Sequence, residues 1–264
     1  MIGQSLLDFF KKNFGKQPTL ELSYSKVSSY RFCPWKYKLL YVDGLKIPPN
    51  PAISLGLSIH RTLEHYHRDK GQSLEDLLET YNQNWVNEGF VNPQQSLTYY
   101  EKGKRMLENY FEFSQLRKSE IVAVEKNFRT PLGSYILRGI IDRIDRWPDG
   151  TYEVIDYKTH AEMWDQNRID SDLQLTLYAV GAKEALSIEA SSLSYFFLAH
   201  NKVVTTQRSE KDKKEALKEL EKTAEKIEKG DFTPNTSQCY RCDFKSSCKY
   251  SVAKAVTNNH VKKS

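Results

Sequence analysis

Residues 135–158 read YILRGIIDRIDRWPDGTYEVIDYK, and this stretch decides the fold. Two runs rich in β-branched and aromatic residues, 135–144 and 152–157, are typical of strands. Between them, residues 148–150 are Pro-Asp-Gly, a sequence that favours a turn. The stretch therefore predicts a β-hairpin.

Each predicted strand of this hairpin carries an acid. Asp142 lies on the first strand, and Asp156 and Lys158 lie two residues apart on the second. Because side chains alternate along a strand, Asp156 and Lys158 share a face, and antiparallel pairing can bring Asp142 beside them. The odd offset of Asp145 from Asp142 puts it on the other face.

This grouping is typical of a nuclease that depends on Mg²⁺. The carboxylates of Asp142 and Asp156 suit hard cations, and the carbonyl of Tyr157 can serve as a further ligand where the strand frays. Lys158 would polarise the attacking water or steady the charge that develops on the phosphate. The hairpin thus predicts hydrolysis of phosphodiester bonds.

The rest of the chain predicts one α/β domain. Helices are expected before the hairpin and strands and helices alternate after it, which favours a central mixed sheet flanked by helices. The core covers about 20–250 of the domain 1–264, and a polar tail occupies 251–264. The predicted helices are 20–42 (with Ser23 or Ser25 as N-cap and a break or restart at Pro34), 53–70, 73–89, 95–116, 172–186 and 210–229, and the further strands are 121–128, 193–198 and 203–207.

Two predicted helices offer polar side chains to such a site. His60, on 53–70, can complete a cation site as a neutral imidazole, and Glu64 follows one turn later. Gln174 and Tyr178, on 172–186, are four residues apart and so share a helix face, from which they can contact a phosphate or hold Lys158. The alternatives are a packed or surface histidine and an ordinary amphipathic helix.

The chain has four cysteines. Cys239, Cys242 and Cys248 form C-x2-C-x5-C, and Cys33 stands far upstream. Four thiolates suit a zinc ion or an iron–sulfur cluster, and the spacing does not separate the two. Two disulfides are the alternative, which a cytoplasmic protein disfavours.

Composition narrows the class of protein. The formal net charge of +5 permits a polyanionic partner such as DNA without requiring one. The sequence contains no run of about 18 apolar residues, so no membrane helix is predicted. The N-terminal residues lack the pattern of a signal peptide. We therefore expect a cytoplasmic protein with no membrane partner.

In this combination of motifs the chain resembles the RecB-like branch of the PD-(D/E)xK nucleases, from about residue 22 to 248. In particular it looks like the iron–sulfur members, the CRISPR-associated RecB-type nuclease and the nuclease domain of AddB. Any one motif occurs often by chance, whereas all six in this order are specific. In chain order they are Cys33; G-x-x-x-H at Gly56 and His60; G-x-x-D at Gly139 and Asp142; D-Y-K at Asp156, Tyr157 and Lys158; Q-x-x-x-Y at Gln174 and Tyr178; and Cys239, Cys242 and Cys248.

The resemblance implies a restriction-endonuclease-like core and a role for each motif. His60, Asp142, Asp156 and the Tyr157 carbonyl would bind Mg²⁺ or Mn²⁺, Lys158 would be the catalytic lysine, and Gln174 and Tyr178 would support the site or contact DNA. The four cysteines would hold a 4Fe–4S cluster that joins the N-terminal and C-terminal segments. Ile141 stands where the family name has proline, as is common in this branch.

The predicted activity is a metal-dependent deoxyribonuclease, an exonuclease on single strands or DNA ends. No G-x-x-x-x-G-K-[ST] motif occurs in the sequence, so unwinding would need a partner. The partners we expect are a helicase or the proteins of CRISPR adaptation. Two alternatives stay open. One is a nucleic-acid-binding protein with an idle site, which a nuclease assay with Mn²⁺ distinguishes, and the other is a zinc-stapled interaction protein, which metal analysis distinguishes.

Overall fold

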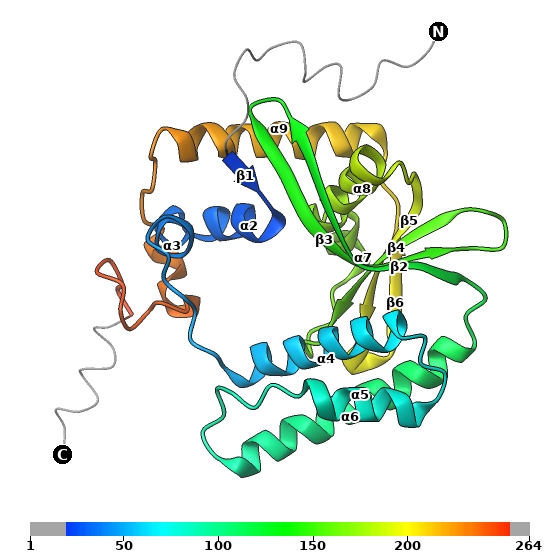
Figure 1. Ribbon diagram of the computed structural model, residues 1–264. Helices are drawn as coiled ribbons and strands as arrows, with labels where there is room; N and C mark the ends of the chain where they lie inside the picture. The colour runs from blue at the N-terminus through cyan, green and yellow to red at the C-terminus, as the bar shows by residue number, and fades with distance from the viewer. Residues whose placement is uncertain (1–19, 254–264) are drawn as a thin grey trace, which may run out of the picture. The chain divides into compact units, whose positions relative to one another are not determined.

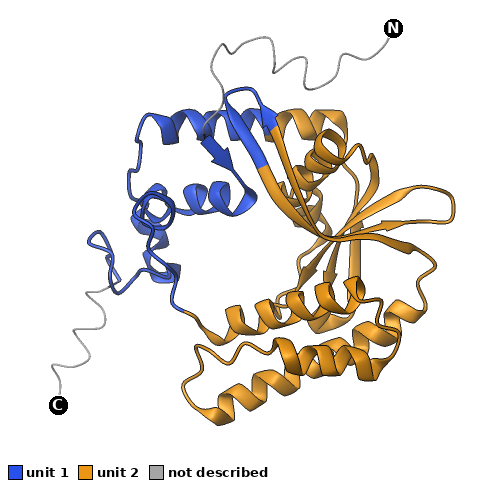
Figure 2. Cartoon of the chain, viewed as in Figure 1, with its two compact units in different colours: residues 1–48, 131–137, 217–264 blue, residues 49–130, 138–216 orange. Residues whose placement is uncertain are grey.

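The computed structural model describes residues 20–253 and divides the chain into two compact units (Figures 1 and 2). Unit 1 comprises Met1–Pro48, Pro131–Leu137 and Leu217–Ser264, and unit 2 comprises Pro49–Thr130 and Arg138–Ala216. Most of the predicted polar tail, 251–264, lies outside the described residues.

The helices and strands follow the predicted order apart from a short strand at residues 20–22 and a short helix at residues 166–170. Their bounds are β1 (Leu20–Leu22), α2 (Tyr24–Phe32), α3 (Pro34–Tyr37), the π-helical η1 (Lys38–Val42), α4 (Pro51–Arg68), α5 (Leu74–Asn84), α6 (Pro93–Gln115), β2 (Glu120–Leu132), β3 (Tyr135–Arg146), β4 (Tyr152–Lys158), α7 (Gln166–Asp170), α8 (Leu173–Leu186), β5 (Ala190–Phe197), η2 (Leu198–His200), β6 (Lys202–Thr206), α9 (Glu210–Glu228) and η3 (Thr236–Arg241).

The predicted hairpin is confirmed. β3 and β4 pair antiparallel, with Arg143 opposite Ile155. The turn is closed by the backbone N–H of Trp147, which donates to the carbonyl of Thr151 at 2.8 Å, and by that of Gly150, which donates back to Trp147 at 2.9 Å. Gly150 has φ +85°, a conformation that glycine adopts without a steric penalty.

The sheet around this hairpin is mixed, as expected. β4 pairs parallel with β5, and β5 pairs antiparallel with β6. β2 pairs with β3 from the other side. Within unit 1, β1 pairs parallel with the first three residues of β3.

Helices cover both faces of the sheet in unit 2. Side chains alternate along β4, so Ile155 and Tyr157 join a buried apolar cluster with residues of α4, α5 and α6. Asp156 and Lys158 lie on the opposite face, where Gln174 of α8 bonds to both. The predicted arrangement of a central sheet flanked by helices is therefore confirmed, and it leaves polar side chains on one face of β4.

The prediction of a helix from residue 20 is wrong for its first three residues. Leu20–Leu22 form strand β1, and helix α2 begins only after Ser23, whose hydroxyl accepts from the backbone N–H of Lys26. Three residues make a strand here because β3 offers them backbone partners, and local sequence carries no sign of that partner. The N-cap at Ser23 and the helix restart at Pro34 are both confirmed.

The predicted helix 73–89 is too long. α5 ends at Asn84, and Trp85 is already extended. The following loop bonds to α4, since Ser58 Oγ accepts from the N–H of Val86 and Ser54 Oγ donates to the carbonyl of Glu88. Those tertiary hydrogen bonds replace the helical ones that the apolar periodicity suggested.

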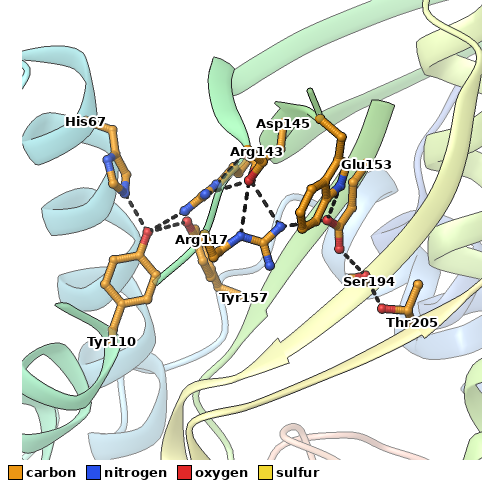
Figure 3. A network of polar contacts seen from close by, with 11 residues as sticks. His67, Tyr110, Arg117, Arg143, Asp145, Glu153, Tyr157, Ser194 and Thr205 are labelled. Atoms are coloured by element: carbon orange, nitrogen blue, oxygen red, sulfur yellow. Dashed lines mark hydrogen bonds and ion pairs between the residues drawn. The ribbon is translucent and has the colours of Figure 1, made fainter. Parts of the chain in front are cut away.

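Behind β3 and β4 lies a buried polar network, on the face away from Asp156 (Figure 3). Arg143 forks onto Asp145, with Nε 2.5 Å from Oδ1 and Nη2 2.6 Å from Oδ2. Arg117 bridges Asp145 at 3.2 Å and Glu153 at 2.6 Å. Two cations thus balance two anions, and these contacts hold the pKa of the Asp145 carboxyl below its usual range although burial raises it.

His67, at one end of this network, gives a prediction about stability. Burial and the nearby Arg143 lower its pKa from 6.5 to about 3. Between these values the unfolded chain binds more protons, so stability should fall with falling pH by about 1.4 kcal/mol per unit. His67→Gln keeps a hydrogen-bond acceptor but cannot titrate. Urea unfolding at about pH 6, 5 and 4 gives the free energy of unfolding at each pH. This free energy should fall less steeply with falling pH in the variant than in the wild type, and an equal dependence on pH would contradict the prediction.

Within the described part of the chain, no helix is long and apolar enough to cross a membrane.

Candidate metal and cysteine sites

The two acids of the hairpin lie side by side. Asp142 and Asp156 are almost completely buried, at 8% and 2% exposure. Asp142 Oδ2 accepts a 2.8 Å hydrogen bond from the backbone N–H of Tyr157, the neighbour of Asp156 on β4. Asp145 points to the opposite face and pairs with Arg143, as its odd offset predicts.

Lys158 and Gln174 surround the second acid. The ammonium of Lys158 lies 2.6 Å from Asp156 Oδ2. The amide of Gln174 joins both groups, because its Nε2 donates to Asp156 Oδ1 at 2.6 Å and its Oε1 accepts from Lys158 at 2.9 Å. Nε2 also donates to the hydroxyl of Tyr178 at 2.9 Å. α8 thus brings both predicted residues, Gln174 and Tyr178, to the site.

Two aromatic rings face the ammonium of Lys158. It lies 4.6 Å from the ring centre of Tyr195 and 5.7 Å from that of Trp164, distances at which a cation is attracted to a π face. The hydroxyl of Tyr195 donates to Asp172 at 2.6 Å, which holds that ring in place. The sequence offered no sign of these rings, since neither lies in a motif.

α4 brings His60 to the same place. Its Nδ1 lies 3.4 Å from Asp142 Oδ2 and 3.7 Å from Glu125 Oε1. Burial lowers the pKa of His60, but the carboxylates of Asp142, Glu125 and Asp156 outweigh this and raise it to about 9. Glu64, one turn further along α4, pairs with Arg68.

Glu125 is a residue that the sequence reading missed. It lies on β2 with φ 43°, a left-handed conformation that is uncommon for a non-glycine residue inside a strand and costs free energy. The one sign in the sequence was the irregular alternation of 121–128, which is what such a local irregularity produces. Ligand atoms of His60, Glu125 and Asp142 lie within 4.8 Å of one another.

The electrostatics of this group favour a cation. Burial raises the pKa of Asp142 to about 7, and the carboxylates of Asp156 and Glu125 add to the shift, while His60 and the N–H of Tyr157 oppose it. When carboxylates lie close together in a buried site, each disfavours ionisation of the others, so protons are held more tightly there. A divalent cation could replace those protons, and carboxylate oxygens with one imidazole suit Mg²⁺ or Mn²⁺.

In unit 1, the four cysteines converge on one cavity, which we call the cysteine cavity. Cys33, Cys239, Cys242 and Cys248 all line it, and none is joined in a disulfide. Cys33 lies between α2 and α3, and its Sγ accepts from the backbone N–H of Asn235 at 3.3 Å. Residues about two hundred positions apart in sequence therefore line the same cavity.

The surroundings of the cysteine cavity suit an anionic group. Lys36 and Lys245 also line it. So do Trp35 and Ser251, whose Nε1 and Oγ are buried and have no hydrogen-bond partner among residues 20–253. Burial raises the pKa of the Cys242 thiol, and Lys36 opposes that shift. The sulfurs of a metal–thiolate centre carry negative charge, so nearby cations and hydrogen-bond donors stabilise them.

The sequence matches one known family over most of its length. A family model described as the PD-(D/E)XK nuclease superfamily matches residues 21–249. The matched range includes all the candidate cation ligands and all four cysteines.

Curated relatives match part of the chain. One subunit of the ATP-dependent helicase/deoxyribonuclease of Streptococcus pyogenes serotype M3 is 28% identical over 187 residues, which cover 65% of this chain and 17% of that protein. The corresponding protein from serotype M6 is 29% identical over the same length. The chain thus spans a small part of the length of these relatives.

Among solved structures, a "Putative exonuclease" from Eubacterium rectale has a TM-score of 0.53 at 12% sequence identity. The match covers 91% of this chain and 94% of that one. At this identity the likeness concerns the fold.

Proposed function

We propose, from the premise that this chain belongs to the PD-(D/E)XK nuclease superfamily, that it is a Mg²⁺- or Mn²⁺-dependent deoxyribonuclease acting on single strands or DNA ends. The observation that carries the proposal is the grouping of Asp142, Asp156 and Lys158 on one face of the hairpin. His60 and Glu125 adjoin this group.

We assign the cation to His60, Glu125, Asp142 and Asp156, with the Tyr157 carbonyl as a further ligand. A bound divalent cation would lower the pKa of a water molecule and offset charge on the phosphate. Lys158 would stabilise the charge that develops on the phosphate oxygens. The aromatic rings of Tyr195 and Trp164 would keep its ammonium oriented toward the phosphate. Gln174 would hold the side chains of Asp156 and Lys158 in a fixed position relative to each other, because its amide bonds to both.

The proposed substrate and partner rest on the relatives' names and on this sequence. The matched Streptococcus proteins are named as helicase/deoxyribonuclease subunits. This chain contains no phosphate-binding G-x-x-x-x-G-K-[ST] motif. We therefore propose DNA as the substrate, and a helicase as the partner that would supply single strands.

For the cysteine cavity we propose a 4Fe–4S cluster held by Cys33, Cys239, Cys242 and Cys248. Four converging thiols, lysines and spare donors support a cluster. Such a centre would staple the segment around Cys33 to the segment around Cys239, because its binding free energy is available only to the folded chain. A single zinc ion is the alternative that the same four thiols would accept.

The decisive experiment uses the full chain with its native metal content and end-labelled DNA. Single-stranded linear DNA should be degraded with Mn²⁺ or Mg²⁺, spared with a chelator, and degraded again when the cation is restored. Circular single strands of the same sequence should persist if the enzyme needs an end. No cleavage of any form with Mn²⁺ would refute the nuclease and favour a DNA-binding protein with an idle site.

Glu125 offers a separate test of the cation site. Glu125→Gln keeps the shape of the side chain but removes its charge, so the affinity for Mn²⁺ should fall by about tenfold. Isothermal calorimetry on the cation-free protein measures this directly. The matched control is Glu120→Gln, an exposed glutamate at the start of the same strand, which should bind Mn²⁺ as the wild type does. Unchanged affinity in Glu125→Gln would remove Glu125 from the site.

A further inference from the structure

The hydroxyl of Tyr110 is a junction between three elements (Figure 3). Tyr110 lies on α6 and is fully buried. Its oxygen lies 2.6 Å from Nε2 of His67 on α4, 2.8 Å from Nη1 of Arg143 on β3 and 3.0 Å from the hydroxyl of Tyr157 on β4. One oxygen atom therefore holds a helix and two strands together.

These three elements are the ones that supply the candidate cation ligands other than Glu125. His67 lies seven residues, or about two turns, after His60 on α4, so both histidines occupy the same side of that helix. Arg143 directly follows Asp142 on β3, and Tyr157 directly follows Asp156 on β4. Tyr110 contributes no ligand, yet two of its partners directly follow one in sequence and the third lies two turns from one on the same helix.

The hydrogens of this junction can be assigned. His67 is neutral at ordinary pH, because burial and Arg143 lower its pKa. Its Nε2 can then accept the hydroxyl proton of Tyr110. Arg143 can only donate, so Tyr110 accepts from it, and the hydroxyl of Tyr157 donates to the second lone pair. In this arrangement the hydroxyl of Tyr110 uses its one hydrogen and both of its lone pairs.

The junction is also rigid. Arg143 is held by two hydrogen bonds to Asp145, and Asp145 accepts further bonds from Ser119 and Arg117. The ring of Tyr110 packs against those of Tyr157 and Phe196, with centroids 5.8 and 5.4 Å away. A buried, fully paired network of this kind restricts the positions that its members can take.

We infer that Tyr110 is a positioning residue that sets the spacing of His60, Asp142 and Asp156 for the cation. The inference rests on the cation site proposed above. Ligands must be held within about 0.5 Å of their productive geometry for tight binding. Through His67, Arg143 and Tyr157, the hydroxyl of Tyr110 fixes the helix and both strands from the face opposite the site.

The test removes that one oxygen. Tyr110→Phe keeps the ring and its packing, and Tyr81→Phe is the matched control. Tyr81 is also fully buried in the same apolar cluster, but among the described contacts its hydroxyl bonds only to the carbonyl of Tyr100, at 3.2 Å, on helix α6. We expect Tyr110→Phe to weaken Mn²⁺ binding by about tenfold in calorimetry and Tyr81→Phe by less than about twofold. Equal Mn²⁺ affinities for the two variants would overturn the inference.

A second measurement needs no cation. In the cation-free protein, exchange of the Tyr157 amide proton reports its hydrogen bond to Asp142, and NMR follows it residue by residue. We expect this exchange to be about tenfold faster in Tyr110→Phe and unchanged in Tyr81→Phe. Tyr157→Phe, which removes the other hydroxyl of the pair, should act in the same direction and serves if Tyr110→Phe fails to fold.

Mn²⁺ binding and the exchange of the Tyr157 amide test the cation site and the positioning role of Tyr110 separately. A wild-type protein that binds no Mn²⁺ would refute the proposed cation site, and the exchange of the Tyr157 amide would still test Tyr110. If that exchange is the same in the wild type, Tyr110→Phe and Tyr81→Phe, the positioning role is refuted. A purely structural role predicts equal effects of the two Tyr→Phe variants on both readouts.

Discussion

Replacing Asp156 with Ala should lower the rate of DNA cleavage by at least about a thousandfold, which corresponds to about 4 kcal/mol of lost transition-state stabilisation. Asp142→Ala and Lys158→Ala should have effects of the same size. The reason is that each removes either a proposed cation ligand or the proposed charge beside the phosphate. His60→Ala should be milder, since one imidazole is only part of the ligand set.

The measurement is the initial rate on labelled single-stranded DNA with Mn²⁺. Circular dichroism and the thermal midpoint would check that each variant is folded. Asp149→Ala is the matched control, because Asp149 lies in the turn of the same hairpin and its carboxylate bonds only to Thr151 among the described contacts. It should cleave at nearly the wild-type rate. Near-normal cleavage by a variant of Asp142, Asp156 or Lys158 would reject the role assigned to that residue.

Replacing Cys33 with Ser should empty the cysteine cavity of metal. Purified without oxygen, the wild type should be brown and contain about four irons per chain. Cys33→Ser should lose most of that iron, as much as Cys242→Ser does, because a four-thiolate site loses one corner in either case. Both variants should also be more sensitive to protease, since the cluster's binding free energy stabilises the folded chain.

Iron and zinc are measured by elemental analysis, and the cluster by its visible absorption. Ser247→Ala is the control, because Ser247 lies between Cys242 and Cys248 in sequence. Within residues 20–253 its hydroxyl makes only a long 3.5 Å contact, to the carbonyl of Phe244. It should keep its iron. A colourless protein with one zinc would refute the iron assignment and keep the staple. Full metal content in Cys33→Ser would remove Cys33 from the site.

The cysteine variants and the variants of Asp142, Asp156 and Lys158 should show that the two sites act independently. The cysteines line a cavity in unit 1, whereas Asp142, Asp156 and Lys158 lie in unit 2. The cysteines are not proposed to act on DNA. Soluble Cys33→Ser protein that still cleaves would therefore agree with the proposal, and Asp156→Ala should keep its full iron content.

The local features of the hairpin could be predicted because they depend on neighbours in sequence. A two-residue period places Asp156 beside Lys158 and sends Asp145 to the other face, whatever surrounds the sheet. A Pro-Asp-Gly turn brings β3 back beside β4, and this sets Asp142 against Tyr157. The helical spacing of four likewise put Gln174 and Tyr178 on one face of α8.

Features that depend on distant partners were missed. Glu125 reaches the site by adopting a left-handed conformation in β2, and the irregular alternation of 121–128 does not identify which residue adopts it. β1 is a strand only because β3 offers it hydrogen bonds. The loop after α5 leaves the helix because Ser54 and Ser58 of α4 bond to its backbone.

By itself, the sequence determined which groups could do chemistry: an acid pair with a lysine, a histidine and four cysteines in an order typical of one family. Residue type and short spacing suffice for that, because they act over one turn or one strand. Only the tertiary structure decided which of these groups meet. It brought Cys33 to Cys239 and Glu125 to His60, and it placed the hydroxyl of Tyr110 at the junction of α4, β3 and β4. Such meetings depend on how whole elements pack, and packing balances the free energies of many residues at once.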